Sequence, residues 1–457
     1  MDGSRIVFLG AGRANVVVGL PITDIPNAPL SLRTSVPTQW AALRIRRAAQ
    51  KECSECYRAL KTYAGSRHVV CLESALYAAI EAVVPPKYLK LIEGATEATI
   101  VPNFTTNPAS LLRMDVTPGK EPEPAAHYTV EVKPKGVWQQ PQVIGIAVNG
   151  ATYWIEEAKH RHCRYTQMRS YKEVRDSTEG EVAATVPAAS PARSDRESQL
   201  NSPYCPNYLF RASLSSREGL RRLMEVPQNN LKVSGYDSSR ALPHRVDTKT
   251  LTMGALDGVA DAIDASDVLT PLSHLQLFGC APPAKGEPAD VVAAKLLPVL
   301  DVELLYRWSL AKDKDEVEWV VLPSNPAAHC SCVDPEANDR ALNIGIARRV
   351  HPLLDFKTCV DRFYVSTTAK DVTLMISVSS LRGVPVASVP CSRFTDVPAE
   401  VGGAFVLRDI DVYRVGAVDL DDKRHKSLDH YYRHDRAIVE TFNKSRVARA
   451  KEESGFH

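Results

Sequence analysis

Two aspartates in the second half of the sequence stand where carboxylates could support phosphoryl transfer. Asp371 directly precedes the apolar run VTLMISV, and Asp419 directly follows the run VYRVGAV. Both runs have the β-branched composition of strands, so we expect both carboxylates at strand ends that face one cleft. Phosphoryl transfer needs carboxylates that hold Mg²⁺ and a group that receives the proton of the attacking hydroxyl. A lone aspartate at a strand end more often forms a turn or a cap, so this pattern alone does not establish the chemistry.

A glycine-containing turn, GAGRAN at residues 10 to 15, separates the apolar runs RIVFL and NVVVGL. Glycines after a strand let backbone N–H groups approach phosphates, as in dinucleotide-binding folds. Those folds need a helix after the turn, whereas NVVVGL is short and β-branched. We therefore predict two antiparallel strands joined by a turn similar to the Gly-rich flap of kinases. An ordinary hairpin turn is the alternative.

The pentad EVKPK ends an alternating, strand-like segment. Strand alternation predicts that Glu131, Lys133 and Lys135 point to one face. Three charges on one face are costly to bury unless they are paired, so Glu131 could hold one lysine while the others meet phosphate. A solvated edge strand explains the pattern equally well.

A basic segment with interleaved tyrosines lies near the C-terminus: Lys423, Arg424, His425, Lys426, Tyr431, Tyr432, Arg433 and Arg436. Its composition suits a solvated basic helix or a weak nucleic-acid patch. It equally suits a cage for a ligand with several phosphates, because each phosphate monoester carries about −1.5 to −2 charge near neutral pH.

The elements that must position these residues are α+β in character. Residues 54 to 84 have a helical pattern that ends at a double proline, and the Pro-rich segment 119–126 indicates a linker. We therefore predict a small N-lobe with an antiparallel sheet at 1–118 and a larger mixed C-lobe at 127–457. Residues 173–202 have almost no large apolar side chain, so we predict a disordered insertion there.

Composition excludes several classes of protein. The 457 residues carry a formal net charge of +2, which favours neither a nucleic-acid nor a membrane partner. Ten cysteines without a regular framework fit a reducing compartment. The N-terminal apolar stretch contains Arg13 and Asn15, so it is not expected to be a signal peptide or a membrane span. We expect a monomeric, soluble, intracellular protein of the nucleus or the cytoplasm.

Four blocks, in order along the chain, resemble the inositol-pentakisphosphate 2-kinase family. EVKPKGVW resembles the signature of that family, and PQNN, TAKDVTLMI and VDLDDK with YYRHDRAIV resemble later family blocks. The resemblance implies a two-lobed inositol-phosphate kinase fold, distantly similar to protein kinases. It also implies ATP as phosphate donor, one or two Mg²⁺ ions, inositol pentakisphosphate as substrate and inositol hexakisphosphate as product.

The resemblance also implies roles for individual residues. Asp371 would be the catalytic base and a metal contact, Asp419 a metal ligand beside the nucleotide, and Asp421 a candidate second metal contact. The implied nucleotide contacts are Gly12, Arg13, Ala14, Asn15, Arg44, Asp115 in the hinge, Glu131, Lys133, Lys232, Met375 beneath the adenine, and Asp419. The implied substrate contacts are Lys135, Arg164, Lys172, Asn229, Lys423, Lys426 and Tyr431.

The sequence departs from the family pattern at several positions. Met168 and Arg169 stand where the family has a Met-His-Gln element, and Arg169 could replace the histidine. Ser427 stands where the family has an arginine, with Lys426 as the expected substitute, and the substrate arginine of the N-lobe has no counterpart. Affinity or ring-position preference could therefore differ from that of the family.

Plant and animal relatives also hold a structural zinc with two histidines and two cysteines. The comparable residues here are His329, Cys330 and Cys332, with His351 or Cys359 downstream. Zinc sites usually separate paired cysteines by two or more residues, so the single residue between Cys330 and Cys332 is poor spacing. We therefore expect no structural zinc.

Two alternatives compete with the kinase hypothesis. A protein that binds inositol polyphosphates without catalysis would keep the basic residues, but the pair Asp371 and Asp419 argues against it. A nucleotide-dependent oxidoreductase could use the GAGRAN turn, but the strand-like residues after the turn argue against that.

Overall fold

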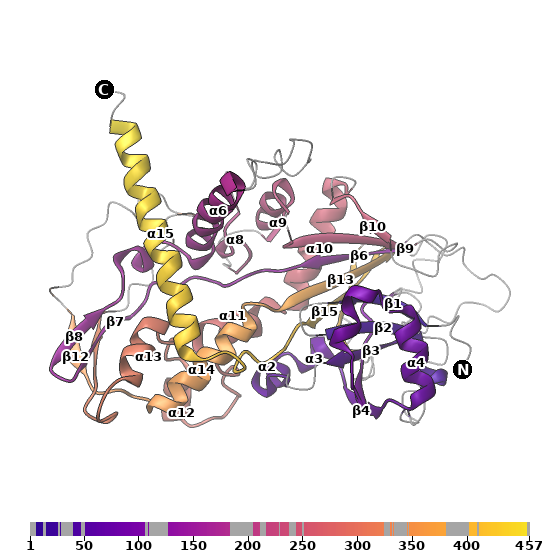
Figure 1. Ribbon diagram of the computed structural model, residues 1–457, viewed down its shortest axis with the longest axis horizontal. Helices are drawn as coiled ribbons and strands as arrows, with labels where there is room; N and C mark the ends of the chain where they lie inside the picture. The colour runs from indigo at the N-terminus through magenta and orange to yellow at the C-terminus, as the bar shows by residue number, and fades with distance from the viewer. Residues whose placement is uncertain are drawn as a thin grey trace. The chain divides into compact units, whose positions relative to one another are not determined.

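The computed structural model describes residues 6–11, 15–25, 28, 40–46, 51–105, 108, 127–182, 204–210, 216–227, 229–236, 244–248, 251–323, 330, 332, 345, 347–380, 402–408 and 411–454. The chain divides into two units, each built from three segments. Unit 1 comprises Met1–Lys133, Asn229–Val268 and Val372–Asp421, and unit 2 comprises Pro134–Gln228, Leu269–Asp371 and Asp422–His457. Each unit combines helices with an antiparallel sheet, which confirms the α+β class (Figure 1). The predicted linker at 119–126 lies outside the described residues.

The first sheet of unit 1 has five antiparallel strands. Their spatial order is β1 (Val7–Ala11), β2 (Asn15–Pro21), β3 (Trp40–Arg46), β5 (Glu97–Val101) and β4 (His68–Cys71). Strands β1 and β2 pair across the glycine-containing turn, with Phe8 opposite Val18. The prediction of two antiparallel strands around this turn is therefore confirmed, and the helix that a dinucleotide-binding fold requires is replaced by a strand.

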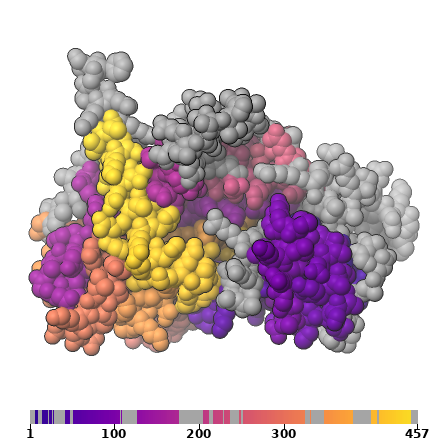
Figure 2. Space-filling model, in the orientation of Figure 1, coloured from indigo at the N-terminus to yellow at the C-terminus, as the bar shows by residue number. Residues whose placement is uncertain are grey.

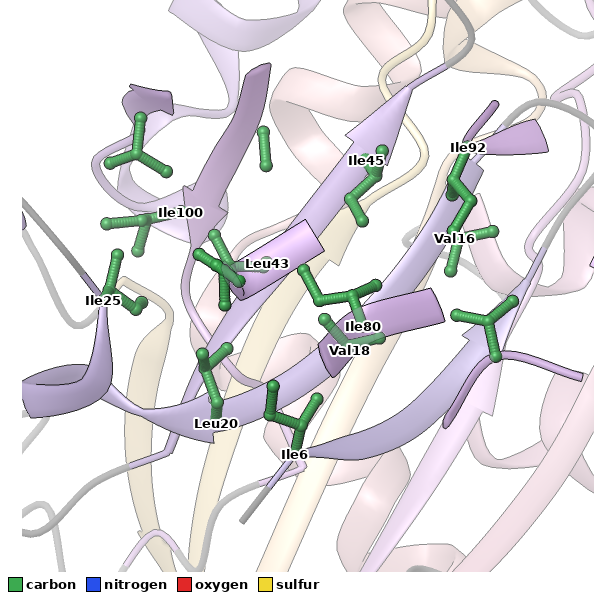
Figure 3. Packing of buried hydrophobic residues seen from close by; sticks show 14 of the residues in the cluster. Ile6, Val16, Val18, Leu20, Ile25, Leu43, Ile45, Ile80, Ile92 and Ile100 are labelled. Atoms are coloured by element: carbon green, nitrogen blue, oxygen red, sulfur yellow. The ribbon is translucent and has the colours of Figure 1, made fainter. Parts of the chain in front are cut away.

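Apolar side chains on one face of this sheet form a core with the helix α4 (Ser74–Val83). Val16 and Val18 alternate along β2, and Leu43 and Ile45 alternate along β3, so each pair points to the same face. Ile80 of α4 packs into the same cluster, as Figure 3 shows. Burial of each large apolar side chain contributes about 1.5–3 kcal/mol, so this face fixes the sheet that carries the glycine-containing turn. Unit 1 also contains η2 (Ile22–Asp24), α2 (Ser54–Ala59), α3 (Lys61–Ala64) and η3 (Pro86–Leu91).

The second sheet of unit 1 has six antiparallel strands and carries most of the predicted chemistry. Their spatial order is β10 (His244–Val246), β9 (Leu231–Tyr236), β6 (His127–Val132), β13 (Thr373–Ser380), β15 (Asp411–Val418) and β14 (Ala404–Arg408). The helix α10 (Met253–Ser266) packs on β14 and β15. Strand β13 begins two residues after Asp371 and β15 ends one residue before Asp419, as the sequence predicted for both strands.

Unit 2 contains a smaller sheet and most of the helices. The strand order is β12 (Arg348–Val350), β11 (Glu318–Val321), β7 (Val143–Val148) and β8 (Ala151–Trp154). The helices are η4 (Glu157–His160), α6 (Arg164–Val182), α8 (Asn207–Phe210), α9 (Ser216–Glu225), α11 (Leu269–Phe278), α12 (Ala289–Lys295), α13 (Val302–Ser309), α14 (Phe356–Ala369) and α15 (Leu428–Ser454). None of the helices in the described part of the chain is both long and apolar enough to cross a membrane.

Helices α6 and α15 lie side by side in unit 2 (Figures 1 and 2). Arg164 at the start of α6 forms an ion pair with Asp435 of α15, with Nη1 and Oδ1 2.9 Å apart. Helix α6 continues to Val182, so residues 173 to 182 are helical although we expected disorder from residue 173 onward. The remainder of that predicted insertion lies outside the described residues.

The packing of β4 generates a stability prediction. Replacing Val70, which is 4% exposed, with alanine should lower the free energy of unfolding by about 2 kcal/mol, because its methyl groups leave a packed core. Val69 on the same strand is 67% exposed, so Val69→Ala should change it by less than about 0.5 kcal/mol. Urea unfolding of the two variants measures both effects. Equal losses would show that this strand does not pack as described.

Candidate active site

A row of three side chains crosses the six-stranded sheet of unit 1. Glu131 on β6 is directly opposite Lys232 on β9 and Met375 on β13. Directly opposite residues in antiparallel strands share a face, so these three predicted nucleotide contacts lie next to one another. Glu131 Oε1 is 3.2 Å from Lys232 Nζ, and both side chains are partly exposed. The row therefore offers an ion pair beside an apolar side chain, which suits a nucleotide.

Asp419 lies at the end of β15 and adopts a φ of 65°, in the left-handed region. Its Oδ2 atom accepts a hydrogen bond of 2.6 Å from Thr373 Oγ1 and lies 3.5 Å from Lys133 Nζ. The Asp419 side chain is 46% exposed, so its carboxylate has room for a further cation. Two predicted nucleotide contacts, Lys133 and Asp419, are thereby brought together.

Strand β6 ends before the EVKPK pentad does. The backbone N–H of Lys133 donates to the Asn230 carbonyl at 2.8 Å, and Lys135 adopts a φ of 65°. The prediction that Glu131, Lys133 and Lys135 continue one strand alternation is therefore wrong at Lys135, because the chain turns at Pro134. The Lys135 carbonyl accepts a hydrogen bond of 2.9 Å from Gln276 Nε2, within unit 2.

The predicted contacts Asn15, Arg44 and Asp421 bind one another inside unit 1. Asp421 Oδ2 accepts hydrogen bonds of 2.6 Å from Asn15 Nδ2 and 2.6 Å from Arg44 Nη2. Asp421 is 7% exposed, unlike the half-exposed Asp419. The remaining predicted nucleotide contacts Gly12, Arg13, Ala14 and Asp115 lie outside the described residues.

In unit 2, Asp371 forms an ion pair with the start of the basic segment. Asp371 Oδ2 is 2.8 Å from Lys423 Nζ, and the Asp371 side chain is 52% exposed. Tyr431 donates a hydrogen bond of 3.4 Å to the Lys423 carbonyl, and Lys426 Nζ is 6.0 Å from the centre of the Tyr431 ring. Burial and the nearby Asp371 carboxylate raise the pKa of Tyr431, so its hydroxyl remains a donor near neutral pH. Three predicted substrate contacts therefore gather beside the predicted catalytic base.

The other predicted substrate contacts are more widely spread. Arg164 is paired with Asp435, while Lys172 is exposed on the same helix, α6. Asn229 belongs to unit 1, where it is exposed in the turn before β9.

Sequence reasoning missed one buried amine next to Asp371. Burial lowers the pKa of Lys370 to about 8, and its aliphatic carbons lie where a side chain at Gly136 would otherwise be. A Cβ added at position 136 would lie 3.0 Å from Lys370 Cγ, so any larger residue there would require the Lys370 side chain to shift by a few tenths of an ångström. The family block around Asp371 includes Lys370, but residue type alone does not indicate burial.

Four cysteines of unit 2 form a buried cluster that fits a metal ion. The sulfur atoms of Cys163, Cys205, Cys330 and Cys332 all lie within 4.8 Å of one another. Cys163 Sγ is 3.7 Å from Cys332 Sγ and 3.8 Å from Cys205 Sγ. A tetrahedral zinc with Zn–S bonds of about 2.3 Å separates its sulfur ligands by about 3.8 Å. The donor set and its spacing therefore suit a structural zinc site.

The expectation that a structural zinc is absent is therefore wrong. Cys330 and Cys332 do belong to the cluster, but the other two sulfurs come from Cys163 and Cys205. The spacing rule failed because it concerns ligands on one loop, whereas Cys163 is 167 residues from Cys330 in the chain. Cys359 instead lies in an apolar cluster with Trp308, and His329 lies outside the described residues.

Comparison with known families assigns the chain to the phosphotransferases that act on inositol phosphates. The family model described as Inositol-pentakisphosphate 2-kinase matches residues 8–437, and the chain belongs to this family. The chain is accordingly a kinase of inositol pentakisphosphate, and its family implies a kinase-like fold and ATP as donor. No curated protein matches the chain.

The cysteine cluster predicts a measurable metal content. The wild-type protein should contain about one zinc per chain, and Cys205→Ser should lose it and melt at a lower temperature, because a structural zinc contributes directly to folding. Cys71→Ser is the matched control, since Cys71 is exposed and outside the cluster. Elemental analysis and thermal melting measure both quantities. Zinc-free wild-type protein with unchanged melting in Cys205→Ser would contradict the site.

Proposed function

We propose that the chain transfers the γ-phosphate of ATP to the 2-hydroxyl of inositol 1,3,4,5,6-pentakisphosphate, which gives inositol hexakisphosphate. The observation that carries this proposal is the family match across residues 8–437. It is supported by the side chains that unit 1 gathers at Asp419 and those that unit 2 gathers at Asp371.

The nucleotide half of the proposal rests on unit 1. Met375 would contact the adenine. Lys133 and Lys232, which now pair with the carboxylates of Asp419 and Glu131, would bind the phosphates of the nucleotide. Asp419 would hold Mg²⁺, which neutralises the charge that develops on the transferred phosphoryl group. The glycine-containing turn between β1 and β2 would cover the phosphates, since its strands are paired like those of a flap. Through these contacts, the N-lobe and the strands that carry Lys232 and Met375 would form the binding site for ATP, the phosphate donor.

The substrate half rests on the cations of unit 2. A substrate with five phosphates carries roughly −7.5 to −10 charges, so it requires several lysines and arginines. Lys423, Lys426 and Tyr431 would bind it beside Asp371, together with Lys135, Arg164, Lys172 and Asn229. Lys423 now pairs with Asp371, so a substrate phosphate would take over part of this contact when it binds.

Asp371 would accept the proton of the attacking hydroxyl and contact Mg²⁺. It lies two residues before Thr373, whose hydroxyl donates to Asp419, and this closeness along the chain supports a common role for the two aspartates. We propose the two-lobed arrangement with 1–118 as N-lobe and 127–457 as C-lobe. A monomeric state and a nuclear or cytoplasmic location are further proposals from the sequence.

Replacing Asp371 with asparagine tests the proposed catalytic base. Asp371→Asn should lower kcat by about 10²–10⁴-fold, because it removes the proton acceptor and a metal charge. Binding of inositol pentakisphosphate, measured by calorimetry, should persist because the lysines remain. Asp429→Asn on the surface of α15 is the control. Wild-type kcat in Asp371→Asn would refute this role, and binding without any turnover of the wild type would favour a non-catalytic binding protein.

Replacing Lys423 with alanine tests the proposed substrate contact. Lys423→Ala should weaken inositol pentakisphosphate binding by about 10- to 150-fold, since a charge-assisted hydrogen bond contributes about 1.5–3 kcal/mol. Lys444→Ala, an exposed lysine farther along α15, should leave the dissociation constant unchanged. Calorimetric titration compares the two variants. Equal affinities for both variants and the wild type would place the substrate elsewhere.

A further inference from the structure

The carboxylate of Asp421 is surrounded by cations of unit 1. One oxygen, Oδ2, accepts hydrogen bonds from Asn15 and Arg44. The other oxygen, Oδ1, lies 3.6 Å from Arg46 Nε, and the Arg46 side chain is 18% exposed. A Mg²⁺ ion binds carboxylate oxygen at about 2.0–2.1 Å, so at Asp421 it would be placed against two guanidinium groups that repel it.

The backbone around Asp421 is fixed as well. The Cys53 N–H donates to the Leu420 carbonyl at 2.9 Å, and Glu52 and Asp421 form an isolated antiparallel bridge. Asp421 therefore connects three parts of unit 1: the end of β15, the segment before α2, and the strands β2 and β3.

The charges of this network are not balanced within the described part of unit 1. Arg44, Arg46 and Arg67 face only two carboxylates, because Glu52 pairs with both Arg46 and Arg67 while Asp421 pairs with Arg44 and Arg46. Burial, together with Arg44 and Arg46, lowers the pKa of Arg67 to about 9, as expected where positive charge is in excess. Loss of the Asp421 charge would leave Arg44 and Arg46 repelling each other in a buried setting.

We propose that Asp421 is a positioning residue for Asp419 and binds no metal itself. Asp419 lies two residues earlier and has a left-handed backbone that costs free energy, so its geometry must be imposed by its neighbours. Thr373 holds its side chain, and the Asp421 network anchors the chain that follows. Asn15 is the last residue of the glycine-containing turn and the first of β2, so the same network ties Asp419 to the strand that carries this turn. The inference rests on the proposed function in one respect, the role of Asp419 as metal ligand.

The test measures Mg²⁺-dependent ADP binding by calorimetry, with melting temperature as a second readout. Asp421→Asn should raise the Mg²⁺ concentration required for half-maximal ADP binding by about tenfold, the usual size of an outer-shell effect. Asp422→Asn is the matched control, because Asp422 pairs with Arg424 and not with this network. It should leave the Mg²⁺ requirement unchanged.

The double variant Asp421→Asn with Arg46→Gln separates positioning from direct ligation, because Arg46 also pairs with Asp421 and is not among the proposed nucleotide contacts. It removes one charge of each sign, so it should return both the Mg²⁺ requirement and the melting temperature toward the wild type. A direct ligand could not be rescued in this way, and a merely structural residue would change melting without changing the Mg²⁺ requirement. Either of those two results overturns the inference.

The variant Asp419→Asn distinguishes a failure of the proposed metal role of Asp419 from a failure of the positioning role of Asp421. If this variant binds ADP with the wild-type Mg²⁺ dependence, the metal role in the proposed function fails. If it loses that dependence while Asp421→Asn keeps it, the proposed function stands and the positioning role fails. Should Asp421→Asn not fold, Arg46→Lys carries the same readouts, because it keeps both charges and changes only the geometry of the contact with Asp421.

Discussion

The pairing of charged side chains at the ends of the central strands is the constraint on which the rest of this structure depends. Glu131 and Lys232 lie on strands whose neighbouring residues are buried, and the pair Asp419 and Lys133 directly follows the ends of two such strands. An unpaired charge at such a position would lose part of its hydration without compensation, so each cation is paired with an anion before any ligand arrives. In the proposed function, the same pairs would hold the lysines where phosphates of a nucleotide could replace the carboxylates as partners.

The partial exposure of these pairs suits a binding site better than a purely structural one. Exposed ion pairs contribute little to stability, about 0–1 kcal/mol, so exchanging one partner for a phosphate costs little. Asp371 and Lys423 in unit 2 follow the same principle, with side chains 52% and 21% exposed. Asp421 is different, because its buried carboxylate holds strands together, and breaking a buried pair is far more destabilising.

The cysteine cluster brings together separate segments of unit 2. The helices α6 and α8 begin just after Cys163 and Cys205, whereas Cys330 and Cys332 lie more than a hundred residues farther along the chain. A metal ion bound to four sulfurs would cross-link these separate segments of the chain and contribute directly to the folding of unit 2. Helix α6 also carries Arg164 and Lys172, so the cross-link would help to position these two proposed substrate contacts.

The sequence by itself determined what depends on local pattern. Alternation and β-branched composition predicted the strands before and after the glycine-containing turn, and those next to Asp371 and Asp419. The EVKPKGVW block indicated the family, because a short motif depends only on the order of residues along the chain. Only the tertiary structure decided which distant groups meet. Asn15 and Asp421 are 406 residues apart, and neither Cys163 nor Cys205 has a nearby partner in sequence. Such contacts arise from strand order and helix packing, which residue periodicity does not encode, so the zinc cluster and the partners of Asp421 became visible only in the fold.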